Sequence, residues 1–179
     1  MLLLLAPSID AEGQGDPYCH VEVVSGSPAL FQLNTVDELT AGKSLYYSTC
    51  LALQFTQEPK EWYLHLRPKS EFFDGAQPNS LSCQVINVKV EQVCLNTPGN
   101  VLGAGMRQKY SSSDISSGLS PVDNTVANGW FSGGTKVDVF TIYVYLRFEI
   151  RPKEYDAAKL VDKPSGYYLN EIDAYVEIK

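Results

Sequence analysis

The strongest constraint on the fold is the alternating pattern of residues 136–150, KVDVFTIYVYLRFEI. Apolar residues fall on one side of this segment, and Thr, Tyr and charged residues fall on the other, which is the period-two pattern of a β-strand. Such a pattern, kept for a dozen residues and rich in β-branched and aromatic types, predicts a long strand with one face on a core. The predicted core residues are Phe140, Ile142, Val144, Leu146 and Phe148.

Further segments alternate in the same way and are separated by turn-like residues. Residues 167–179 and 61–67 are the clearest, and 61–67 follows the long apolar segment 45–56 after a turn that contains Pro59. The pair 45–56 and 61–67 therefore predicts a β-hairpin with Trp62 turned inward. Together with shorter candidates at 18–24, 29–33 and 81–95, these segments predict an all-β protein: an immunoglobulin-like or jelly-roll antiparallel β-sandwich with long loops.

Residues 96–135 are the irregular part of the sequence, with seven of the thirteen glycines. We expect long loops here and one short strand at 122–126. The alternation of 81–95 slips near Val85 and Ile86, which indicates a bulge or turn in the middle of that segment. The polar connection 151–165 predicts a short helical turn at 155–160, and no long amphipathic helix is predicted anywhere.

Length and charge limit the classes of function. With 179 residues, 44% of them apolar, the chain suffices for one folded domain, assigned to 18–179 after an N-terminal apolar segment and linker at 1–17. The net charge of −7 argues against nucleic acid as a partner, because phosphate binding needs a basic face. No apolar run reaches 18 residues, so no helical membrane span is predicted.

The four cysteines suggest two disulfide bonds and an oxidising compartment. We predict the pairs Cys83–Cys94 and Cys19–Cys50, because the first brackets a segment that could fold back on itself and the second would join the first strand to a neighbour. Free thiols in a reducing compartment are the alternative.

Catalytic motifs are missing from the sequence. There are two histidines, and His65 lies on the outward side of its predicted strand. His20 next to Cys19 could begin a metal site, but no second pair has ligand spacing. We therefore expect neither an enzyme nor a metal or other cofactor.

Five aromatic residues are candidates for contact with a ligand or partner. Trp130 and Phe131 lie in the glycine-rich stretch GWFSGG, where an exposed ring could stack on a sugar or a protein. Alternatively, Trp130 folds back over the end of the sandwich. Tyr143, Tyr145 and Tyr175 lie on the outward sides of the two best strands, either as an interaction stripe or as ordinary decoration of a solvent-facing sheet.

The apolar N-terminus MLLLLAPSI is the candidate assembly segment, with Leu2, Leu3, Leu4, Leu5 and Ile9. It is similar to the tail of a secretory signal but lacks the basic region, since the first Lys or Arg is Lys43. It has the right length for one strand. We expect it to add to a sheet edge, in its own chain or in a neighbouring copy, unless it is only a signal remnant.

Two stretches resemble secreted bacterial pilin-like subunits. They are LYYSTCLALQFTQEPKEWYLHLRPKSEFFDG, with a long apolar strand leading into a Trp-x-Leu-x-Leu strand, and the ending that follows Gly166-Tyr167-Tyr168, together about a quarter of the chain. The resemblance implies an immunoglobulin-like sandwich, export, a disulfide between early strands and polymerisation by strand exchange. The second cysteine pair and the 96–135 insertion depart from the family pattern.

These observations predict a structural subunit of an extracellular filament or surface layer, assembled by β-strand addition. Its main partner would be copies of itself, and it would be secreted to the cell surface. The alternative is a carbohydrate-binding or adhesin module that contacts a glycan or a cell surface through Trp130 and the tyrosines.

Overall fold

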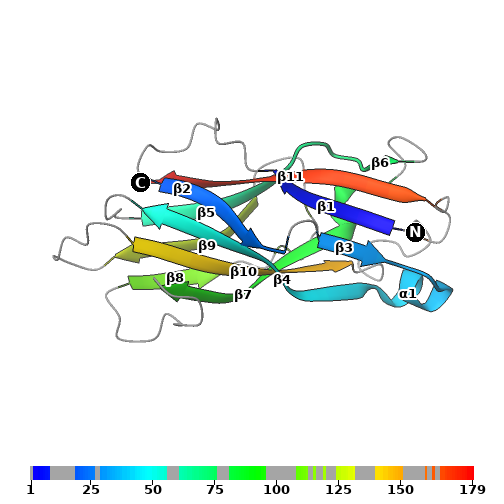
Figure 1. Cartoon of the computed structure of the whole chain (residues 1–179), viewed down its shortest axis with the longest axis horizontal. Coiled ribbons are helices and arrows are strands. Elements are labelled where there is room, and N and C mark those ends of the chain that lie inside the picture. The colour runs from blue at the N-terminus through cyan, green and yellow to red at the C-terminus, as the bar shows by residue number, and fades with distance from the viewer. Residues whose placement is uncertain are drawn as a thin grey trace.

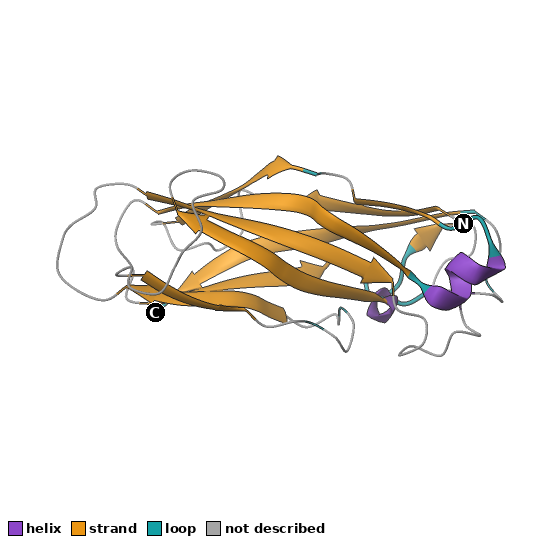
Figure 2. Ribbon diagram, turned by 90° about the horizontal axis from the view of Figure 1, so that it is seen from below, coloured by secondary structure: helices purple, strands orange, loops and turns teal. Residues whose placement is uncertain are grey.

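The protein is an elongated β-sandwich whose strands run along its long axis (Figure 1). The computed structural model describes residues 2–8, 19–26, 29–55, 61–75, 81–95, 108–112, 115, 119, 124–131, 140–150, 160, 163 and 166–179. Within these ranges almost all regular structure is β, as Figure 2 shows, and the predicted all-β sandwich is confirmed.

Two sheets pack on each other. The larger has the strand order β3-β1-β11-β5-β9-β8, with the short β6 beside β11, and the smaller has the order β2-β4-β10-β7. The strands of the larger sheet are β1 Leu2–Ser8, β3 Ala29–Gln32, β5 Glu61–Pro68, β6 Asp74–Gly75, β8 Gln108–Ser112, β9 Asn124–Phe131 and β11 Tyr167–Ile178. Those of the smaller sheet are β2 Cys19–Ser25, β4 Lys43–Phe55, β7 Ile86–Leu95 and β10 Phe140–Ile150.

The pairing of these strands is nested, which identifies the topology. In sequence, the bridge between Val88 and Ile115 falls between β5 and β9, which pair with each other. The pair β5–β9 in turn falls between the paired strands β4 and β10, and β3 and β11 come before and after all of these. Successive pairs alternate between the two sheets, so the chain resembles one long antiparallel ribbon wound around the core. Of the two topologies left open by the sequence, this winding is that of a jelly roll, since an immunoglobulin sandwich pairs more of its consecutive strands within one sheet.

The alternating patterns place the core as expected. Ile142, Val144, Leu146 and Phe148 of β10 are all buried, while the side chain of Phe140 lies outside the described residues. Trp62 of β5 is also buried and contacts Phe55 of β4 across the sandwich, with 6.3 Å between ring centroids. Trp62 also lies over Gly129, its partner in β9, where an added Cβ would come within 2.6 Å of the indole.

The predicted hairpin of 45–56 with 61–67 is wrong. Both segments are strands, β4 and β5, but β4 pairs with β2 and β10, whereas β5 pairs with β11 and β9. Each strand has an apolar face, and placing them in opposite sheets turns both faces onto one core. The chain therefore passes from the smaller sheet to the larger between Phe55 and Glu61.

The irregular region contains more strand than the sequence indicated. Instead of a short strand at 122–126 there is β9, and β8 pairs with it. The phase slip near Val85 and Ile86 is real: the 3₁₀ turn η1, Cys83–Val85, ends where β7 begins. The predicted helical turn at 155–160 lies almost wholly outside the described residues.

One short helix, α1 Val36–Ala41, was not predicted. Thr35 caps it: its hydroxyl accepts from the Glu38 backbone N–H, and the Glu38 carboxylate accepts from the Thr35 N–H. This capping box was visible in the sequence as Thr-x-x-Glu, but six residues are too few for helical periodicity to show.

Candidate functional site

The N-terminal segment is strand β1 of the larger sheet. It pairs in parallel with β11, from Leu2 opposite Tyr167 to Ser8 opposite Asp173, and antiparallel with β3. Leu2, Leu3, Leu4 and Leu5 are thus placed between the two outermost strands of the ribbon, while Ile9 lies outside the described residues. Apart from β1 with β11, the described strand pairs are antiparallel.

The predicted tyrosine stripe does not form. Tyr143 and Tyr145 lie on β10 of the smaller sheet, but Tyr175 lies on β11 of the larger sheet. Their outward faces therefore point away from different sides of the sandwich, and the three rings cannot form one patch. Sequence alternation gave the face of each strand correctly but contained no information on which strands are neighbours.

Trp130 and Phe131 are the last residues of β9 and do not lie in a loop. Trp130 pairs with Glu61 on one side and with Lys109 on the other, and Phe131 pairs with Gln108. Their side chains lie outside the described residues, so their role in ligand contact stays a prediction.

The two predicted disulfides are wrong, and all four cysteines are free thiols. Cys19 lies opposite Phe55 on β4, five residues from Cys50, which separates the two by about 17 Å along the strand. Cys83 lies in the 3₁₀ turn before β7, and Cys94 lies near the far end of β7, about 26 Å along the strand from its first residue, Ile86. A disulfide requires its Cα atoms to lie within about 7 Å of each other.

The thiols differ in their surroundings. Burial raises the pKa of the Cys83 thiol to about 12, and it also raises the pKa of Cys50. The Cys83 Sγ lies 2.8 Å from the Asn170 Nδ2, and this amide also donates to the Ser70 and Phe72 carbonyls, which fixes β11 to the chain segment after β5.

Alkylation of the native protein under non-reducing conditions is therefore expected to find four free thiols after unfolding. In the folded state the half-buried Cys19 should react first and Cys83 last, because its thiol stays protonated at neutral pH. Peptide mapping by mass spectrometry measures both, and reductant should leave the melting temperature unchanged. Recovery of a Cys19–Cys50 or Cys83–Cys94 peptide would contradict the strand register.

The most elaborate local structure is a set of bulges in the smaller sheet. In β4 the residues Tyr46, Tyr47 and Ser48 lie opposite the single residue Arg147 of β10. Neighbouring irregularities occur at Val24 of β2 and Glu91 of β7. We call residues 46–48 the tyrosine bulge. Consecutive strand residues normally point to opposite faces, but here Tyr46 and Tyr47 are both exposed, 64% and 57%.

An ionic network lies beneath the tyrosine bulge. Arg147 lies 3.5 Å from the Glu91 carboxylate and 3.0 Å from the Glu149 carboxylate, and its guanidinium carbon is 4.8 Å from the centroid of the Tyr46 ring. Glu91 also accepts the backbone N–H of Tyr47 at 2.6 Å. The Tyr47 ring meets Tyr145 edge-on, with centroids 5.9 Å apart.

Backbone contacts with β10 and with Gly26, which follows β2, also hold the tyrosine bulge. Tyr47 has φ +46°, a left-handed conformation that costs a non-glycine residue about 1–2 kcal/mol. Ser48 donates its hydroxyl to the Leu146 carbonyl and Thr49 donates to the Gly26 carbonyl. Gly26 packs so closely that an added Cβ would lie 1.6 Å from the Ser48 carbonyl oxygen. Strain maintained by so many contacts is typical of functional positions.

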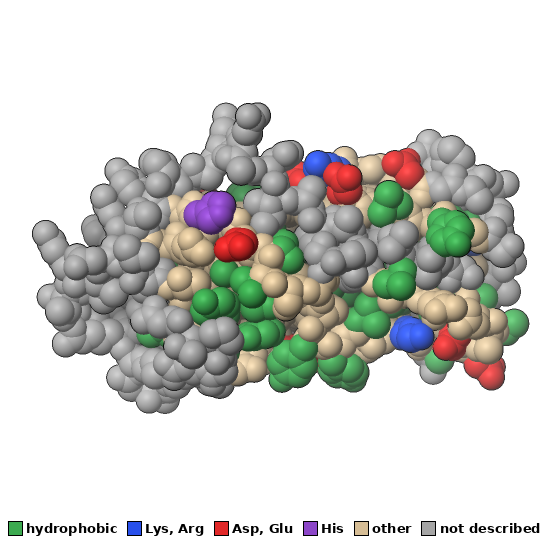
Figure 3. Space-filling view, in the orientation of Figure 1, with side chains coloured by type: hydrophobic (Ala, Val, Ile, Leu, Met, Phe, Trp, Pro, Cys, Tyr) green, Lys and Arg blue, Asp and Glu red, His purple; other side chains and the backbone are tan. Residues whose placement is uncertain are grey.

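The tyrosine bulge was not predicted from the sequence. The available signal was weak: Tyr46 and Tyr47 interrupt the alternation of segment 45–56, and Glu91 and Arg147 are charged residues on strands otherwise rich in apolar side chains. Figure 3 shows hydrophobic side chains reaching the surface along the lower side of the visible face, where Figure 1 places the middle of β4.

The outer face of the larger sheet has a ladder of cross-strand pairs between β5 and β11. His65 stacks on Tyr175 with centroids 5.0 Å apart, and Arg67 pairs with Asp173 at 3.6 Å. The His65 Nε2 lies 3.5 Å from Glu177, and its Nδ1 lies 3.2 Å from the Thr125 hydroxyl. These contacts assign His65 a place in a stabilising ladder on this face.

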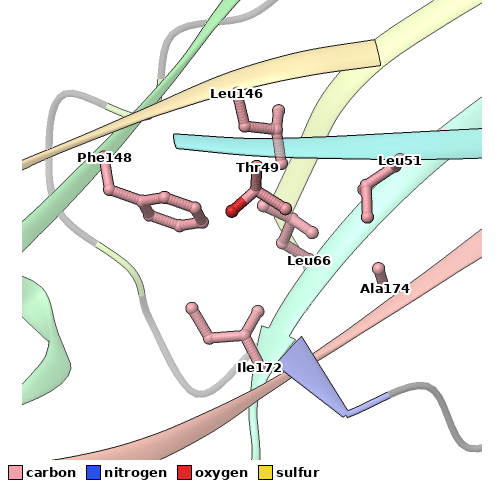
Figure 4. Close-up of a pocket in the computed structure, with 7 residues that line it drawn as sticks. All are labelled: Thr49, Leu51, Leu66, Leu146, Phe148, Ile172 and Ala174. Atoms are coloured by element: carbon pink, nitrogen blue, oxygen red, sulfur yellow. The ribbon is translucent and has the colours of Figure 1, made fainter. Parts of the chain in front are cut away.

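The core contains a small cavity between the sheets. It measures about 10 Å³, near the smallest space that holds one water molecule. Its walls are apolar apart from one hydroxyl, and Figure 4 shows the side chains converging from β4, β5, β10 and β11: Thr49, Leu51, Leu66, Leu146, Phe148, Ile172 and Ala174. A cavity of this size is a packing defect and not a ligand site.

Comparison with known proteins adds no assignment: no protein-family model matches the chain, and no curated protein matches it. Among the described residues, no group of three or more His, Cys, Asp or Glu side chains is arranged to hold a metal ion. Within the same ranges, no helix has both the length and the apolar character needed to cross a bilayer.

Proposed function

We propose that the protein is a structural subunit that assembles with copies of itself through β1, in an extracellular filament or surface layer. The observation that carries the proposal is the place of β1 between β3 and β11. β3 and β11 do not pair with each other, and β1 lies between them and pairs with both, so it occupies the place where the two ends of the wound ribbon would otherwise meet.

The pairing of β1 supports strand addition in physical terms. Its backbone pairs on both sides over most of its length, with β11 from Leu2 to Ser8 and with β3 from Leu2 to Leu5. A strand supplied by a neighbouring copy could make the same backbone hydrogen bonds in the same register, as in other cases of strand addition. The proposal thus names copies of this chain as the main partner and assigns it no catalytic activity.

The jelly roll favours one further form of assembly. This architecture is shared by viral capsid subunits and lectins, so a closed shell is the second candidate, by analogy of fold alone. The carbohydrate-binding or adhesin alternative rested on Trp130 and the tyrosine stripe. It keeps only Trp130, because Tyr175 lies on the other sheet, and the test below includes a result that would favour it. Export rests on the pilin-like resemblance, since the free thiols give no argument for an oxidising compartment.

Deletion of residues 1–8 tests the proposal. We expect the intact protein to form filaments, sheets or shells in negative-stain images and the deletion variant to form none. Leu4→Pro should act similarly, because it removes a backbone donor in the middle of β1, whereas Leu4→Val should not.

If the deletion variant has lost its cooperative melting transition, a peptide with residues 1–12 should restore this transition without restoring assembly. That result would show that the rest of the chain still folds around the strand. Unchanged assemblies after deletion would contradict strand addition. A protein that stays monomeric and binds a glycan array would favour the adhesin module.

A further inference from the structure

A second contact between copies is indicated by the exposed residues of the smaller sheet. Both rings of the tyrosine bulge are exposed on the outer face, although they are adjacent in sequence, and each lies against a neighbour, Tyr46 over Arg147 and Tyr47 against Tyr145. The left-handed Tyr47, the Glu91 carboxylate and the close approach of Gly26 keep them there. The tyrosine bulge is thus a rigid, pre-formed projection, and little freedom remains to be lost when it binds.

A hollow of matching character lies on the larger sheet, in the gap between the end of β5 and β6. Its walls include the side of Leu169, which is 41% exposed, and the polar residues Lys69, Asp74 and Glu171. Its volume is about 250 Å³, just below the roughly 300–1,000 Å³ of pockets for drug-sized ligands. It has room for an aromatic side chain but little more.

A tyrosine side chain, with its apolar ring and polar hydroxyl, suits a hollow that has both an apolar and a polar wall. The apolar ring would cover Leu169, and the phenolic hydroxyl would donate to the Asp74 carboxylate at the polar wall, since the Glu171 carboxylate already pairs with Lys69 at 2.8 Å. Tyrosine is also among the residues most enriched at the energetic centres of protein interfaces. The chain itself supplies two such rings on a rigid support.

The projection and the hollow lie on different sides of one molecule. In Figure 1, β6 and the first half of β11 run along the upper side, and the middle of β4 lies along the lower side. One copy therefore cannot fill its own hollow with its own tyrosines. A contact between two different surfaces is heterologous and repeats from copy to copy.

We propose that the tyrosine bulge of one copy docks in the hollow between β5, β6 and β11 of the next. The inference rests on the proposed function, which it deepens by naming a second pair of surfaces within the same assembly. The occupant of the hollow is a second copy of this chain.

The test is a double-mutant cycle on assembly, followed by light scattering over a series of protein concentrations. The variants are Tyr46→Ser/Tyr47→Ser, Leu169→Glu and the combination of both, with Val36→Ser as the control because Val36 is equally exposed but lies on α1. Each single-surface variant should raise the concentration needed for assembly at least about tenfold, the change expected for loss of an interface anchor. The control should not change it.

The combined variant decides the pairing. If the two surfaces contact each other, both single-surface variants lose the same interaction. The combined variant should then need a protein concentration for assembly that is little higher than that of the weaker single-surface variant. The docking would be overturned if the two fold-increases in this concentration multiplied in the combined variant. It would also be overturned if the tyrosine or Leu169 variants assembled like the intact protein while deletion of β1 still abolished assembly. Melting temperatures check that these exposed substitutions leave the fold intact.

Discussion

Replacement of Phe148 by alanine is expected to lower the free energy of unfolding by about 3–5 kcal/mol. Phe148 is 4% exposed on β10 and already borders the core cavity, so the substitution enlarges a space that the surrounding strands do not fill. A loss of this size is a large part of the roughly 5–15 kcal/mol that stabilises a typical domain. Urea denaturation followed by fluorescence measures it.

The matched control is Leu146→Met at the same cavity. It conserves the apolar volume of the core, so it should cost less than about 1.5 kcal/mol. A loss below about 1 kcal/mol for Phe148→Ala would mean that β10 is displaced by one residue, which exchanges its two faces.

Gly26→Ala is the second substitution with a large expected effect. Gly26 has φ +82°, and a methyl group there would overlap the backbone carbonyl of Ser48. The backbone conformation should cost about 1–2 kcal/mol and the displacement of β4 a further 1–3 kcal/mol. The flexible end of a side chain could move aside, but the carbonyl cannot do so without moving the tyrosine bulge.

The same denaturation experiment measures this loss, and Ser25→Ala is its control because the neighbouring position is exposed. Assembly should also weaken at concentrations where the variant is folded, since the bulge is displaced. A Gly26→Ala protein as stable as the control would show that β2 does not approach β4 as described.

The faces of individual strands could be predicted from sequence because period-two alternation reports burial directly. Ile142, Val144, Leu146, Phe148 and Trp62 were assigned to the core on this basis, and the structure confirms them. The pairing partner of each strand could not be predicted in the same way. Alternation is local, whereas the pairing of β4 with β10 joins residues from 85 (Phe55 and Phe140) to 107 (Lys43 and Ile150) positions apart. Both the hairpin and the tyrosine stripe were therefore assigned to the wrong neighbours.

The disulfide error has a related cause. The expectation for Cys83 and Cys94 assumed that the segment between them folds back on itself. The slip is instead a single 3₁₀ turn, and β7 continues without reversal and carries the cysteines apart. Cysteine spacing limits which bonds are possible but cannot replace knowledge of the strand register.

The tyrosine bulge was unpredictable for a further reason. Its conformation depends on contacts from three other strands: Glu91 of β7, Arg147 of β10 and Gly26 at the end of β2. No local pattern in 45–56 contains this information. A left-handed tyrosine is unfavourable by itself, so sequence propensity alone argues against the structure that is present.

Sedimentation velocity of the intact protein over a wide concentration range tests the central claim most directly, because self-assembly is the property on which both proposed contacts depend. We expect species larger than the monomer to increase with concentration and to disappear when residues 1–8 are deleted. A single monomeric species at every concentration, from a protein with a cooperative melting transition, would contradict the assignment as a self-assembling subunit.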